Sequence, residues 1–196
     1  MTSSDLGQLA LLSIKKPAEA AQFLLNMRLD SQTLWTGLFL VAVSNTLLFS
    51  ISNMMVPGPS PIPGLFNNPM IYFLFVTGGL VLTVYALFWV GRGLGGAGGL
   101  YDVMVLIVWM QALRVVVQGA TLVLLLTMPA LSALLVLAAA VIGIYMLVHF
   151  IDQAHGFGSV GRAVGVLIAS VLAIVLGLSL LLSLSGFPIG GVPGYV

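Results

Sequence analysis

Long, uninterrupted apolar runs dominate the chain. Five of them are long enough to cross a bilayer as helices, and they cover residues 34–56, 69–90, 101–127, 129–151 and 160–184. The hydrocarbon core of a membrane is about 30 Å thick and is spanned by about 20 apolar residues in a helix. The pattern therefore predicts an all-α, polytopic membrane protein, a bundle of five transmembrane helices.

Helix start and stop signals stand at the ends of these runs. Asp30 can cap the first helix, and Asn68 followed by Pro69 gives the second helix a cap and a proline in its first turn. Glycines in residues 91–99 end the second helix, and Met128-Pro129 is the only helix-breaking signal between the third and the fourth helix. We expect a tight hairpin there, because proline disfavours the helical conformation in the residue before it.

The segment before the first span follows a different pattern. Ala21 and Leu24 fall on one side of a short helix and Glu19 on another, which is typical of an amphipathic segment on the inner membrane surface. A helix docked on the inner ends of the spans is the alternative. We divide the chain into a cytoplasmic amphipathic segment, residues 1–30, and a transmembrane domain, residues 31–196.

Composition supports the membrane assignment and removes several function classes. The chain is 60% apolar and 6% charged, against about 45–50% and about 25% in ordinary globular domains. Its net charge of +1 gives no basic field that would attract nucleic acid. Cysteine is absent, so disulfides, thiolate metal sites and cysteine nucleophiles are excluded.

The distribution of basic residues predicts the orientation. With five spans, the basic residues outside them all fall on one side, whereas residues 57–68, the hairpin and the tail 186–196 carry no charge. Because positive loops stay in the cytoplasm, we expect a cytoplasmic N-terminus and a C-terminus outside. The basic residues used here are Lys15, Lys16, Arg28, Arg92 and Arg162.

One polar stripe lies inside a predicted span. Arg114 is about 13 residues from either end of the third span, roughly 20 Å at 1.5 Å per residue, and an arginine there costs about 2.5–3.5 kcal/mol on insertion scales. Gln111 and Gln118 share its helix face, and Asn45, halfway through the first span, is the polar side chain expected to meet it. The stripe is a candidate polar site for an anion, a lipid headgroup or water. Interhelical hydrogen bonding is the alternative.

The fifth span carries small residues at a spacing of four. Such a row allows another helix backbone to approach closely, so we interpret it as a helix-packing face toward this chain or a second copy. The row consists of Gly161, Gly165, Ala169, Ala173 and Gly177.

No arrangement of side chains predicts catalysis, a metal or a cofactor. His149, Asp152 and His155 are spaced by three, but glycines end the helix there, and we interpret them as a hydrated inner loop in which Asp152 can pair with Arg162. The glycines at 91, 93 and 96 have the spacing of a dinucleotide-binding motif. That motif follows a β-strand, whereas a predicted membrane span precedes these glycines, so the match carries no function. We interpret that loop as a flexible connector, and we expect no enzymatic activity.

Taken together, five features resemble the Yip family of Ypt/Rab-interacting, five-span membrane proteins, in a bacterial form. They are the PAEAA sequence at residues 17–21, the glycine-rich loop leading into Gly99-Leu100-Tyr101, the polar third span, the hairpin at Pro129, and the run HGFGSVGRA at residues 155–163. The resemblance implies a five-helix bundle with a cytosolic N-terminus, no known enzymatic reaction and, in eukaryotes, roles in membrane trafficking and bilayer shaping with small GTPases. We expect this chain to lie in a bacterial inner membrane. GTPase binding is not carried over, because only the short segment 1–30 precedes the first span, whereas eukaryotic members carry a long cytosolic region there.

Three functions remain open. The leading hypothesis is a non-enzymatic protein that acts through helix packing and contacts with membrane lipids or proteins, in membrane organisation or complex assembly. The second is a small transporter, channel or lipid scramblase that uses the Arg114 stripe. The third is an accessory subunit of a larger membrane complex, joined through the small-residue row.

Overall fold

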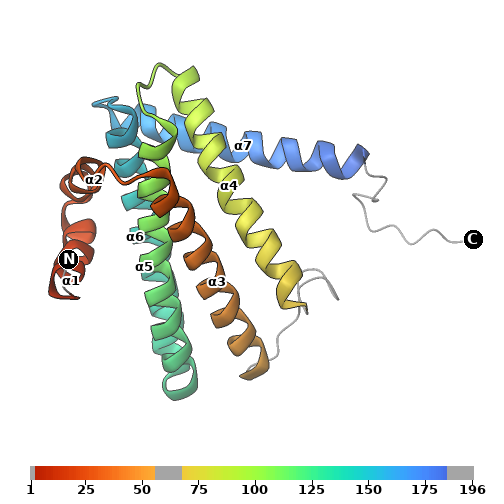
Figure 1. The fold of residues 1–196 in the computed structure, drawn as a ribbon. Helices are drawn as coiled ribbons and strands as arrows, with labels where there is room; N and C mark the ends of the chain where they lie inside the picture. Colours follow the sequence, from red (N-terminus) through yellow and green to blue (C-terminus); the bar gives the residue numbers. More distant parts are fainter. Residues whose placement is uncertain (1–2, 56–67, 185–196) are drawn as a thin grey trace, which may run out of the picture.

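The computed structural model describes residues 3–55 and 68–184 and is all-helical (Figure 1). In the described residues, five helices, α3 to α7, are long and apolar enough to cross a membrane, so the predicted all-helical fold class with five candidate spans is confirmed. The predicted end of the first span, residue 56, lies outside the described residues. The helices are α1 (Ser3–Lys15), α2 (Pro17–Asn26), α3 (Ser31–Met55), α4 (Pro69–Gly93), α5 (Leu100–Thr127), α6 (Pro129–His155) and α7 (Val160–Leu184).

Helix ends are fixed by the expected local chemistry. The Asn68 side chain accepts a hydrogen bond from the Met70 backbone N–H at 2.9 Å, and a proline occupies the first turn of both α4 and α6. At the start of α5, the Gly99 N–H donates to Asp102 Oδ2 at 2.8 Å. These bonds satisfy backbone groups that have no partner inside the helix.

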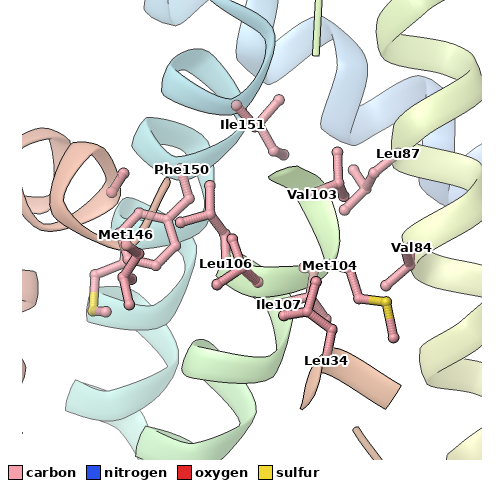
Figure 2. Packing of buried hydrophobic residues seen from close by; sticks show 14 of the residues in the cluster. Leu34, Val84, Leu87, Val103, Met104, Leu106, Ile107, Met146, Phe150 and Ile151 are labelled. Atoms are coloured by element: carbon pink, nitrogen blue, oxygen red, sulfur yellow. The ribbon is translucent and has the colours of Figure 1, made fainter. Parts of the chain in front are cut away.

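The apolar core lies at one end of the bundle. We call this the charged end, because Asp102 and Asp152 lie there, and we call the opposite end, at Met128, the hairpin end. Residues 103–107 of α5 are all buried, and Figure 2 shows Val103, Met104, Leu106 and Ile107 among side chains of α3, α4 and α6. The labelled core residues are Leu34, Val84, Leu87, Val103, Met104, Leu106, Ile107, Met146, Phe150 and Ile151.

The two N-terminal helices pack against the bundle. Ala20 and Ala21 of α2 are fully buried, and α2 contacts α5 and α6. The Trp109 indole N–H of α5 donates to Ser13 Oγ of α1 at 2.9 Å. Both helices are therefore joined to the transmembrane helices, α2 by packing and α1 by this hydrogen bond as well.

The last helix departs from the simple bundle. Helices α3 to α6 run along one another, whereas α7 crosses α4 and α6 at a steep angle and projects beyond them (Figure 1). The turn before it, residues 156–159, sets this direction: Gly156 and Gly158 have φ values of 65° and 60°, and Asp152 Oδ1 accepts a hydrogen bond from the Ser159 N–H at 2.9 Å. Glycine adopts such left-handed conformations without steric cost.

Candidate functional site

Arg114 lies near the middle of α5, and its side chain is exposed. Ile107, seven residues earlier, is on the same helix face, yet it is buried and lines the same small cavity as Leu87 of α4. Figure 1 shows that α4 diverges from α5 toward the hairpin end, with α3 drawn between them. This face of α5 is thus buried at Ile107 and exposed at Arg114.

The remaining stripe residues have different environments. Gln111 and Gln118 are half-buried, and Gln118 Oε1 is a buried acceptor without a hydrogen-bond partner in the part of the chain that the structure describes. Asn45 is buried in α3, but its side-chain amide donates to the Val41 carbonyl of its own helix at 3.0 Å. Among the described residues, no hydrogen bond joins Asn45 to Arg114.

An aromatic pair from two other helices stands close to Arg114. The rings of Phe49 in α3 and Tyr72 in α4 are stacked, with centroids 3.9 Å apart, and the Tyr72 hydroxyl lies within electrostatic range of the Arg114 guanidinium. The pattern of apolar runs gave no signal for this neighbour, because an aromatic residue near a span end is common.

No carboxylate side chain can neutralise Arg114 within its own chain. The five acidic residues lie either at or before Asp30 or at the charged end, as Asp102 and Asp152. The one ion pair in residues 3–55 and 68–184 joins Lys16 and Glu19. Arg114 therefore presents an uncompensated positive charge on an open face, near the depth at which the insertion cost is greatest.

Two glycines of the small-residue row of α7 have open space beside them in the described part of the chain. A methyl group added at Gly165 or Gly177 would meet no atom within 4 Å. The residues of α7 that pack against the bundle are instead Ala163, Val166 and Ser170, all buried. A packing face toward a second copy or another protein stays a prediction.

His155 differs from the hydrated loop residue that its sequence context suggested. It is 2% exposed, because α4 and the following loop enclose its ring. A methyl group added at Gly91 would overlap the ring, and one added at Gly96 would lie 2.7 Å from His155 Nδ1. We call this arrangement the His155 cradle. Neither ring nitrogen has a hydrogen-bond partner in the described part of the chain.

The cradle also corrects the interpretation of the glycine-rich loop as a flexible connector. The Ala97 N–H donates to the His155 carbonyl at 3.0 Å, and the Gly96 N–H donates to the Gly91 carbonyl at 2.9 Å. Glycine is needed here for close approach rather than for mobility. Asp152 accepts a hydrogen bond from the Ser159 N–H instead of forming the expected pair with Arg162.

A small, partly open cavity of about 10 Å³ lies beside the cradle and is lined by residues of α4, α5 and α6. Its walls are apolar apart from the imidazole, and its size suits at most one water molecule. The lining residues are Leu87, Val103, Leu106, Ile107, Leu147, Phe150, Ile151, Ala154 and His155. The cavity is too small for a cofactor or a transported solute.

The sequence was compared with models of known protein families. The model of the Yip1 domain matches residues 11–181. The chain belongs to the Yip1 family. Proteins of this family are generally non-enzymatic membrane proteins. No match was found among curated proteins or among solved structures.

The Yip1 domain begins inside α1 and ends inside α7, so it includes both the Arg114 stripe and the His155 cradle. Two sequence features that carried the family resemblance, the loop before residue 101 and the run 155–163, lie side by side at the charged end through the Ala97–His155 backbone hydrogen bond. Each feature is local in the sequence. Their association in one cradle depends on the packing of α4 on α6.

Proposed function

We propose that this Yip1-family protein acts without catalysis, through contacts of its membrane-embedded helix faces with lipids or with other membrane proteins, in membrane organisation or complex assembly. The observation that carries the proposal is the uncovered length of α7. From Val171 to Leu180, most side chains are exposed, and all but one are apolar or glycine. Such a surface is suited to association inside the bilayer, where small residues allow close helix packing.

The absence of cysteine from the chain makes a direct test possible. Leu176→Cys places a single thiol on the uncovered face of α7, and Val166→Cys places one where this chain itself buries it. In native membranes, a photoactivatable thiol reagent at residue 176 should give adducts with lipid or with protein neighbours. The label at residue 166 should give few adducts. Equal yields at the two positions would contradict a contact role for α7.

Lipid movement is the second candidate function, and the exposed Arg114 favours it. A polar side chain on an open face near the membrane middle lowers the barrier for a headgroup to cross. Vesicles with fluorescently labelled lipid should then exchange lipid between leaflets faster with the wild-type protein than with Arg114→Leu. Under the leading proposal, wild-type and protein-free vesicles exchange lipid at the same rate.

We also propose that the protein lies in a bacterial inner membrane with its charged end in the cytoplasm. The positive-inside tendency supports this, since Arg92 and Arg162 lie in the terminal turns of α4 and α7 at that end, and Lys15, Lys16 and Arg28 precede the first span. Single cysteines at the exposed positions Gly93 and Met128 test it in intact cells. A membrane-impermeant maleimide should label residue 128 and leave residue 93 unlabelled, and the opposite pattern would reverse the orientation.

A further inference from the structure

We infer that Arg114 forms the anion-binding part of a lateral, membrane-facing site for the phosphate group of a phospholipid headgroup. This site lies at the exposed Arg114 side chain of α5, beyond the buried stretch 103–107 on the side of the hairpin end. The inference rests on the proposed function, because it names the lipid chemistry that one of the embedded helix faces would contact.

The first step is the position of the guanidinium. Ile107 and Arg114 share one face of α5, yet only Ile107 is buried. Arg114 is near the middle of the 28-residue helix, far from the headgroup layer. A phosphate that pairs with it therefore approaches the helix from the lipid side.

The second step is the origin of the counter-charge. All five acidic side chains of the chain stand at or before Asp30 or at the charged end. A second copy of the chain would bring the same acids at the same depths, together with another Arg114. Self-association in parallel thus adds positive charge rather than compensating it. The anion must come from a molecule other than this protein.

The third step is the kind of anion. Guanidinium groups bind phosphate through two parallel hydrogen bonds. Arg114 is exposed, so lipid is the molecule that contacts it in a membrane, and its charge has no carboxylate beside it in the chain. A phospholipid supplies the anionic phosphate that this guanidinium lacks, and exposure and charge together therefore favour lipid. Gln118, one turn further along, is not open to the headgroup, because its Oε1 is buried.

The experiment uses full-length protein that has been purified in neutral detergent and stripped of lipid. Thermal unfolding is followed while short-chain phosphatidylglycerol, inorganic phosphate or a short-chain diacylglycerol is added. Phosphatidylglycerol alone should stabilise the wild type in a saturable manner. Because a hydrogen bond to a charged group contributes on the order of a tenfold change in affinity or more, Arg114→Leu should raise the half-saturating lipid concentration at least about tenfold.

Matched variants keep the result interpretable. Arg114→Lys retains the charge without the bidentate geometry and should fall between wild type and Arg114→Leu. Arg92→Leu removes an exposed arginine at the charged end of α4 and should bind lipid like the wild type. Arg114→Leu removes a charge from an apolar environment, so it should fold, and Arg114→Gln serves the same purpose if it does not.

Several outcomes would overturn the inference. Equal lipid responses of wild type and Arg114→Leu would place the headgroup elsewhere. If inorganic phosphate alone stabilised the protein, the ligand of Arg114 would be a free anion. If diacylglycerol stabilised it as well as phosphatidylglycerol does, the phosphate group would have no role. A protein crosslinked specifically through residue 114 would identify a partner carboxylate as the ligand. The crosslinking test at residue 176 involves a different helix, so the proposed function can fail or stand independently of this result.

Discussion

The His155 cradle gives a sharp prediction for the substitution Gly91→Ala. Gly91 is buried in the last turns of α4, and a methyl group added there would overlap the His155 ring. The ring has little room to move away. It is 2% exposed, it lies 5.3 Å from the Phe157 ring between centroids, and the His155 carbonyl is held by the Ala97 N–H.

The magnitude follows from two opposing terms. Replacing a helical glycine by alanine stabilises the helix by about 0.8–1 kcal/mol, whereas overpacking of a well-packed site costs about 1–3 kcal/mol. Gly79, in the same helix, is the matched control, because a methyl group there would meet no atom within 4 Å. The helix-propensity gain is common to both variants. Gly91→Ala should therefore be less stable than Gly79→Ala by about 1–3 kcal/mol.

Unfolding of the purified protein in mixed micelles, titrated with a denaturing detergent, measures this difference. The double variant Gly91→Ala/His155→Ala should recover part of the loss, since the added methyl group then occupies space vacated by the ring. Contacting residues show coupling energies of about 0.5–3 kcal/mol. Equal stabilities of Gly91→Ala and Gly79→Ala, or no coupling to His155, would refute the cradle.

Three further predictions concern single elements. The hydroxyl and the backbone N–H of Thr33 donate to Asp30 and hold the pKa of that carboxyl below its usual value, so the stabilisation is present above pH 3.8 and is lost as the pH falls through the lowered pKa. Asp30→Ala should destabilise α3 at pH 7 and have little effect near pH 2, as followed by thermal unfolding. Ser13→Ala leaves the Trp109 N–H without its acceptor and should cost about 1–3 kcal/mol, checked by detergent unfolding. Ala163→Leu, at a fully buried position of α7, should cost about 1–3 kcal/mol in the same titration, and an unchanged midpoint would show that α7 does not rest on the bundle there.

The amino-acid sequence determined which segments are helical and which can cross a membrane. In lipid, every backbone polar group has to be satisfied inside its own segment, so an apolar run of sufficient length forms a helix whatever its neighbours are. Start signals act over the same short range, as at Asn68 and Pro129. For the same reason the depth of Arg114 and the absence of a carboxylate beside it follow from residue positions alone.

The partners of those helices were decided only by the tertiary structure. Gly91 and His155 are far apart in the chain, and nothing local indicates that a ring from α6 fills the space left by a glycine of α4. Likewise, the spacing of small residues in α7 gave no direction for that helix, because the turn at Gly156 and the fit of Ala163 against the bundle set it. Helix formation depends on contacts within one segment, whereas the choice of helix face depends on the shapes of side chains brought together from distant segments.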